Sequence, residues 1–179
     1  MKTTTLNKKK LTIPLLVILI VCIATMRLFD APLKNEVSPN GIVSFELAKD
    51  ISVSKNILNS WNDKAKANAG LSLGVDFLFL LVYSSFIALL IYNINNRLWK
   101  GKAFYKAGKI FIYLIFIAAL FDIIENIVLL KLLSGDLKQV WSSMAYYFAS
   151  MKFILILICL FYLIINWLAY LLVQKKIKT

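Results

Sequence analysis

The segment that decides the fold is AALFDIIENIVLL, residues 118–130, which places two carboxylates and an amide inside an apolar run. That run covers about 110–133, and three similar runs cover about 11–29, 71–94 and 148–173. A helix needs roughly 20 apolar residues to cross about 30 Å of hydrocarbon, so each run is long enough to span a membrane. We therefore predict an all-α membrane protein, a bundle of four transmembrane helices forming one integral membrane domain over residues 1–179.

The composition agrees with a membrane protein and excludes several kinds of site. Of the 179 residues, 60% are hydrophobic and 17% are charged, whereas about 25% are charged in a typical soluble domain. The absence of histidine removes His-ligated zinc and the Ser-His-Asp triad. Cys22 and Cys159 fall inside different predicted spans without a CxxC spacing, so we expect no disulfide and no metal site. No catalytic residue and no cofactor can be assigned.

The net charge of +12 is concentrated in alternate connections. Four bases lie in the first ten residues, five lie from Arg97 to Lys109, and three lie in the last five residues, with no acid among them. The positive-inside rule then places both termini in the cytoplasm and the loop from Asp30 to Gly70 outside a bacterial inner membrane. Because the excess charge follows topology, the expected partner is the lipid bilayer and not nucleic acid.

The first apolar run allows two interpretations. The lysines that precede it and the small residues at Cys22–Ala24 resemble a signal peptide with a weak cleavage site,. We expect a retained membrane anchor, and cleavage is the alternative. The topology of the later spans is the same in both cases.

The outer loop contains IVSFELAKDISVSKNILNSW, residues 42–61. Leu47, Ile51, Leu58 and Trp61 recur at helical spacing, which predicts one amphipathic helix on the outer membrane face or over the bundle. Such a helix is either a simple interfacial element or a lid over a pocket. Glu46 belongs neither to the apolar stripe nor to an obvious ion pair, so we include it among the candidate site residues.

Polar residues recur in the outer half of the later spans. Asp122, Glu125 and Asn126 share one helix face, and Lys152 lies in the last span. A charge at the centre of an inserted helix costs about 2.5–3.5 kcal/mol, so these groups must be paired, protonated or hydrated. Acids outnumber local bases, which predicts a polar pocket open to the outside. Its candidate residues are Glu46, Asp76, Tyr83, Asp122, Glu125, Asn126 and Lys152.

Four short motifs occur in a recognisable order: FELA at 45–48, LGVDFLFLLVYS at 73–84, DIIEN at 122–126 and MKF at 151–153. This pattern resembles an uncharacterised family of small bacterial four-helix integral membrane proteins, over about residues 41–155. The resemblance implies that the acidic residues, Asn126 and Lys152 belong together. It implies no reaction, cofactor or substrate.

Three functions fit these residues. The first is binding or transport of a cation, an amine or a lipid headgroup, for which four spans suggest a homodimer. The second is a membrane enzyme acting on a lipid-linked substrate, with one carboxyl group as general acid or base and Lys152 holding an anionic headgroup. The third is an accessory subunit of a larger membrane complex, in which the polar groups are structural.

Overall fold

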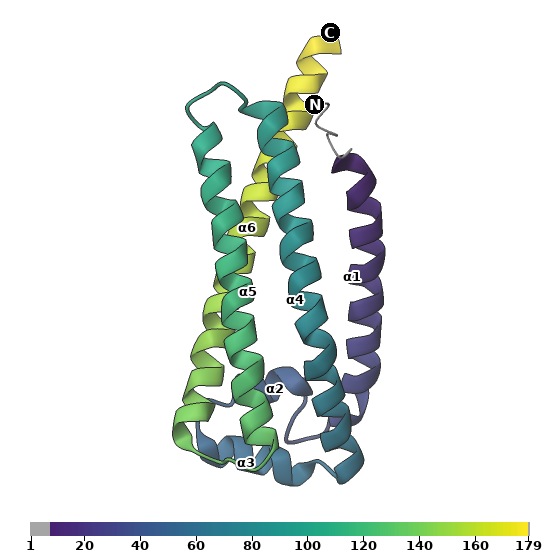
Figure 1. The fold of residues 1–179 in the computed structure, drawn as a ribbon, viewed down its shortest axis with the longest axis vertical. Coiled ribbons are helices and arrows are strands. Elements are labelled where there is room, and N and C mark those ends of the chain that lie inside the picture. The colour runs from purple at the N-terminus through teal and green to yellow at the C-terminus, as the bar shows by residue number, and fades with distance from the viewer. Residues whose placement is uncertain (1–7, 179) are drawn as a thin grey trace, which may run out of the picture.

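Four long helices form the body of the protein. The computed structural model describes residues 8–178, with side chains from 11 to 174. The long helices are α1 (Lys8–Asp30), α4 (Asp63–Leu98), α5 (Tyr105–Leu133) and α6 (Gln139–Lys178), which run along the long axis in Figure 1. Each is long and apolar enough to cross a membrane, and no strand occurs in the part of the chain that the structure describes. The predicted all-α bundle with four membrane-spanning helices is therefore confirmed.

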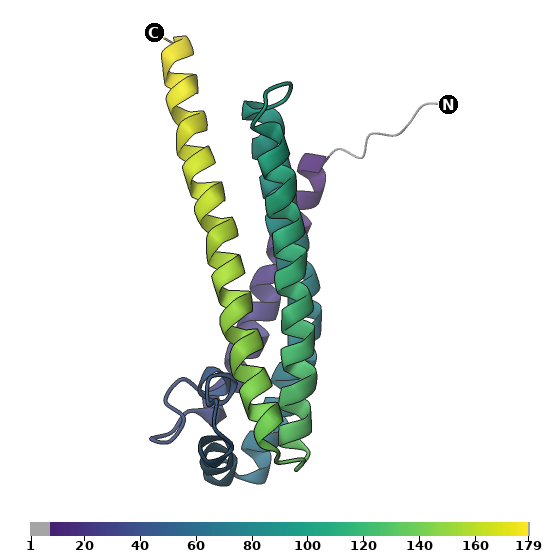
Figure 2. The same ribbon diagram turned by 90° about the vertical axis from the view of Figure 1, so that its left-hand side faces the viewer.

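Three short elements connect α1 to α4. They are the 3-10 helix η1 (Ala31–Leu33), α2 (Ile42–Glu46) and α3 (Ile51–Ser60). Figures 1 and 2 show α2 and α3 at one end of the bundle, which we call the loop end. The start of α1 and the end of α6 lie at the opposite end, which we call the terminal end. The connection between α4 and α5 is also at the terminal end.

The prediction of one continuous helix over residues 42–61 is wrong. The chain leaves the helix after Glu46, and Lys49 adopts a left-handed φ of 61° before α3 begins at Ile51. The side chain of Gln139 in α6 accepts from the Ile51 amide at 2.9 Å and donates to the Lys49 carbonyl at 3.1 Å. These bonds replace the intrahelical bonds that a continuous helix would make, and they come from a residue 88 positions away. The break lets α2 and α3 bury different faces.

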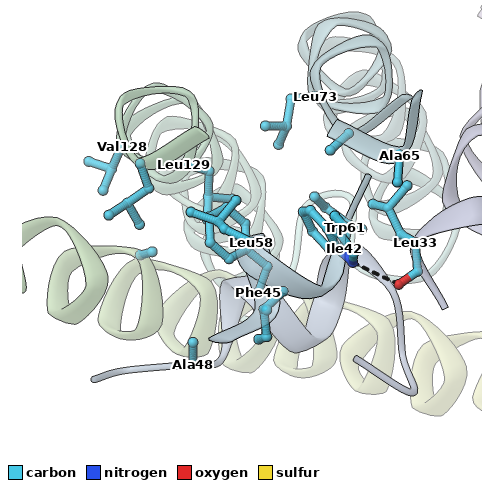
Figure 3. Close-up of a cluster of buried hydrophobic side chains, with 14 residues drawn as sticks. Leu33, Ile42, Phe45, Ala48, Leu58, Trp61, Ala65, Leu73, Val128 and Leu129 are labelled. Atoms are coloured by element: carbon cyan, nitrogen blue, oxygen red, sulfur yellow. Dashed lines mark hydrogen bonds between the residues drawn. The ribbon is translucent and has the colours of Figure 1, made fainter. Parts of the chain in front are cut away.

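A hydrophobic cluster fixes α2 and α3 to the loop end. The rings of Phe45 and Trp61 pack edge to face with their centroids 5.4 Å apart, and both side chains are almost fully buried. The Trp61 indole donates to the Leu33 carbonyl at 2.9 Å, the dashed line in Figure 3. Leu73 of α4 and Leu129 of α5 complete the cluster. The connection is thus part of the folded core and not a loose loop.

The long helices differ in how much they are covered. Helix α4 packs against α1, α5 and α6, and α5 also packs along α6. Only 6% of the apolar stretch of α1 is buried, against 44% in α4 and in α5. Most of the apolar surface of α1 is therefore left to face lipid. The helices that carry the candidate site, α4, α5 and α6, form the centre of the bundle.

Candidate functional site

The ammonium group of Lys152 lies at the centre of the candidate site. Its Nζ is 2.8 Å from Asp122 Oδ1 and 2.8 Å from Glu125 Oε2. It is also 3.9 Å from Glu46 Oε2 of α2. All four side chains are buried. One amino group therefore joins α5, α6 and the short helix α2.

The arrangement of α5 and α6 explains why Lys152 contacts both Asp122 and Glu125. Asp122 and Glu125 are three residues apart and share the face of α5 that is turned toward α6,. The two helices are joined by the short turn at 134–138 and run in opposite directions. Residues about equally far from this turn lie at the same depth, which brings Lys152 level with both carboxylates.

Helix α4 contributes a second set of contacts. The Tyr83 hydroxyl donates to Asp122 Oδ2 at 3.1 Å. The Asn126 amide donates to Asp76 Oδ2 at 2.6 Å. The structure thus brings every sequence-predicted site residue into one group, which we call the polar cluster: Glu46, Asp76, Tyr83, Asp122, Glu125, Asn126 and Lys152.

The polar cluster has more acids than bases, and some of its buried oxygen atoms have no hydrogen-bond partner. Four buried carboxyl groups face one buried lysine. Glu46 Oε2, Glu125 Oε1 and Asn126 Oδ1 are buried without a hydrogen-bond partner. Glu125 Oε2 is close to Nζ but outside hydrogen-bonding geometry, so that contact is an ion pair only. An unsatisfied buried polar group costs about 1–3 kcal/mol, and a protonated Glu46 lowers this cost by hydrogen bonding to Glu125.

The polar cluster is closed in this structure, whereas the sequence suggested a pocket open to the outside. Asp76 exposes 7% of its surface, and Glu125 and Asn126 expose none. Helix α2 covers the cluster at the loop end with Glu46 and the buried ring of Phe45. A ligand from outside would therefore have to displace α2 or arrive from the side.

A small cavity lies beside the polar cluster on the α1 side. Its volume is about 190 Å³, and Arg27 and Asp30 of α1 line it together with Ile42 of α2. Ser72 and Phe79 of α4 also line it, one turn before and one turn after Asp76 on the same helix face. Among the described residues that line this cavity, none belongs to the polar cluster.

A second polar group, at the terminal end, was largely missed by the sequence analysis. The Trp99 indole donates to Asn166 Oδ1 at 2.6 Å, and Tyr162 donates to Asn95 Oδ1 at 3.3 Å. Asn95 also donates to the Tyr105 carbonyl at 3.0 Å. A Cβ at Gly108 would clash with the buried side chain of Asn95, so any larger residue there would force Asn95 to shift. The only sequence signal was the shared helix face of Lys152, Cys159 and Asn166.

Comparisons of the chain with protein-family models, curated proteins and solved structures find no match, so no relative supports the family resemblance or a bacterial origin. The functional argument therefore depends on the fold and on the polar cluster.

Lys152→Met should lower the free energy of unfolding by about 3–5 kcal/mol, because it leaves two buried carboxylates without their partner,. Thermal unfolding of the purified protein in detergent measures the loss. The double variant with Glu125→Gln should recover much of it. Lys138→Met removes an exposed ion pair with Asp136 and should leave the midpoint almost unchanged. A Lys152→Met protein as stable as the wild type would contradict this account of the cluster.

The pH dependence of the free energy of unfolding should show whether Glu46 is protonated in the folded protein. Burial raises the pKa of Glu46, and the Asp122 carboxylate raises it further, while the Lys152 ammonium opposes both. The folded state therefore favours the protonated acid. Its contribution to stability is complete below the ordinary pKa of 4.5 and is lost as the pH rises through the raised folded value.

Glu46→Gln should therefore unfold with a flatter pH dependence above pH 4.5 than the wild type. Glu36→Gln, which changes an exposed acid of the same connection, is the matched control and should keep the wild-type slope. Chemical unfolding at a series of pH values compares the three proteins. A steeper loss with rising pH in Glu46→Gln would mean that Glu46 is charged in the folded state.

Proposed function

We propose that this chain is a multi-pass protein of a bacterial cytoplasmic membrane that binds a small ammonium-type cation in its polar cluster. Both termini lie in the cytoplasm in this proposal, so the loop end and the polar cluster lie toward the outside. The observation that carries the proposal is the convergence of two carboxylates on one buried ammonium, with two further buried carboxyl groups beside it.

The distribution of charge supports the orientation. The segments 1–29, 77–121 and 137–179 contain no acidic residue, and they supply both ends of the chain and the α4–α5 connection. The bases of the terminal end are therefore uncompensated, as expected for cytoplasmic connections. The exposed bases of the loop end lie among acids such as Asp30, Asp50 and Asp63.

The chemistry of the polar cluster supports an ammonium ion over a metal ion. Among the described residues, no three His, Cys, Asp or Glu side chains are grouped so that they could hold a metal. The carboxylates of Asp122 and Glu125 already form ion pairs with an ammonium at 2.8 Å. A second ammonium has up to three N–H donors, which suit Glu125 Oε1 and Asn126 Oδ1.

The arrangement suggests how the ligand competes with groups of the chain itself. Lys152 occupies Asp122 and Glu125 in the closed state, and Asp76 has only a neutral amide as hydrogen-bond partner. A small cation arriving through the cavity beside Ser72 would meet Asp30, which lines the cavity, before it reached Asp76. It would supply positive charge that Lys152 alone cannot supply, since three acids besides the protonated Glu46 accompany one base.

A structural role in a larger membrane complex is the second candidate function. The observation that favours it is that Lys152 ties α2, α5 and α6 together inside a closed cluster. In that case the polar cluster would stabilise the fold and would not respond to added cations. The two candidates therefore differ in ligand dependence.

The orientation predicts the behaviour of reporter fusions. A phosphatase that is active only outside the cytoplasm should be inactive when fused after Thr179 and active when fused after Asp136. A fusion after Lys102, in the α4–α5 connection, is a further control and should be inactive. The opposite pattern of activities would reject the proposed orientation.

Cation binding predicts a saturable rise in thermal stability. Methylammonium chloride should raise the unfolding midpoint of the wild-type protein in detergent, and tetramethylammonium, which has no N–H donor, should not at equal ionic strength. A ligand at 100 times its Kd adds about 2.7 kcal/mol. Asp76→Asn should abolish the response, whereas Asp63→Asn, which changes an exposed acid of the same helix, should preserve it.

The variant Lys152→Ala gives a second measurement, because it leaves space beside Asp122 and Glu125. Propylammonium should restore part of its lost stability, and tetramethylammonium should not. Equal responses of the wild-type protein to methylammonium and tetramethylammonium would reject cation binding in favour of the structural role. Rescue of Lys152→Ala alone would not save the proposal, because it would show only that the carboxylates accept an ammonium.

A further inference from the structure

A groove at the terminal end has no part in the proposed cation site. Its volume is about 480 Å³, and it lies between α1, α4 and α6. Arg97 on α4 lines it, 21 residues after Asp76, which corresponds to about 31 Å along the helix. The groove is thus at the opposite end of the bundle from the polar cluster.

The walls of this groove are mostly hydrophobic and reach the lipid-facing surface. They are formed by Leu90, Ile94, Leu163, Ile164 and Trp167. Ile164 and Trp167 expose more than half of their surface, and Figure 2 shows α6 diverging from the other helices toward this end. In a membrane, such a surface faces hydrocarbon chains and not water. The natural occupant of these walls is an acyl chain.

The polar residues of the groove would contact the headgroup of such a lipid. Of the side chains that the structure describes, Arg97 is the one charged group that lines the groove, and Asn93 lies one turn earlier on the same helix. The guanidinium of Arg97 stacks over the Tyr170 ring at 5.4 Å, which holds it at the α4–α6 side. A planar guanidinium suits the oxygens of a phosphate group, with which it forms bidentate hydrogen bonds.

The surroundings of Arg97 favour negative charge. No acidic residue occurs within 20 positions of Arg97 in the sequence, and none occurs in α6. Lys100 and Lys102 lie three and five residues after Arg97, and the α1 backbone places Lys8–Lys10 in the turn before Thr12 of the groove. Clustered bases at a membrane surface attract anionic lipids. A zwitterionic headgroup would gain less from this charge.

We propose that this groove binds one anionic phospholipid, with an acyl chain along Leu163 and Ile164 and the phosphate against Arg97. The proposal does not depend on cation binding, because none of its residues belongs to the polar cluster. If both termini are cytoplasmic, the lipid comes from the inner leaflet. The ligand class is set by the combination of an apolar groove, a stacked arginine and uncompensated positive charge.

Native mass spectrometry of the detergent-solubilised protein tests this site with two lipids of identical acyl chains, phosphatidylglycerol and phosphatidylcholine. One phosphatidylglycerol per chain should bind more tightly than phosphatidylcholine, because the two lipids share the phosphate group but only phosphatidylcholine carries an ammonium that the surrounding bases repel. Arg97→Gln should weaken phosphatidylglycerol binding about tenfold, the factor expected for loss of a charge-assisted hydrogen bond to the phosphate. Lys106→Gln removes an equal charge from the exposed surface of the same end and should leave the preference unchanged.

A groove-filling variant separates the acyl-chain site from general surface attraction. Leu163→Trp should weaken binding of both lipids, because the larger side chain occupies the space of the acyl chain. Thermal unfolding without added lipid shows whether each variant is folded, and Arg97→Lys replaces Arg97→Gln if the latter is not. Equal affinity for the two lipids, an equal loss in Lys106→Gln, or unchanged binding in Leu163→Trp would each overturn the proposal.

Discussion

The ion pairs of Lys152 inside the apolar bundle are the constraint on which the other features depend. An ammonium and two carboxylates at 2.8 Å are tolerated in a membrane only while they remain together,. This requirement fixes how α5 and α6 align, because sliding one helix by a turn would separate the charges. It also holds Glu46, and with it α2, over the loop end. The register of two spans and the closed state of the cluster therefore have one physical cause.

The same requirement explains which parts of the structure were predictable from the sequence. The four spans follow from uninterrupted apolar length, and the inward faces follow from the cost of exposing Asp76, Asp122, Glu125 or Lys152 to lipid. Helical spacing alone placed Asp122, Glu125 and Asn126 on one face. Each of these inferences needs only local sequence and the energy of transferring a charge, and the structure brings all of these residues together.

The missed features depend on contacts between distant residues. The break between α2 and α3 is stabilised by Gln139, whose position beside Ile51 follows only from the folded bundle. The burial of Glu46 depends on that break, because it lets α2 turn toward Lys152. The terminal polar group escaped notice because Asn95 and Trp99 sit near a helix end, where polar residues are ordinary. Sequence patterns describe one helix at a time, and these features belong to several.

The two polar groups of the bundle differ in a way that bears on function. In the terminal group, both polar atoms of Asn95 and both of Asn166 have hydrogen-bond partners, and no member is charged. That group has the composition expected of a structural network, since buried polar groups stabilise a fold only when they are satisfied.

The polar cluster at the loop end departs from this pattern in charge balance and in hydrogen bonding. Buried ion pairs are seldom better for stability than apolar residues of similar volume. In the polar cluster, protonation of Glu46 reduces the excess of negative charge. Uptake of a cation, as proposed above, would reduce it further and would supply donors to the unpaired oxygens.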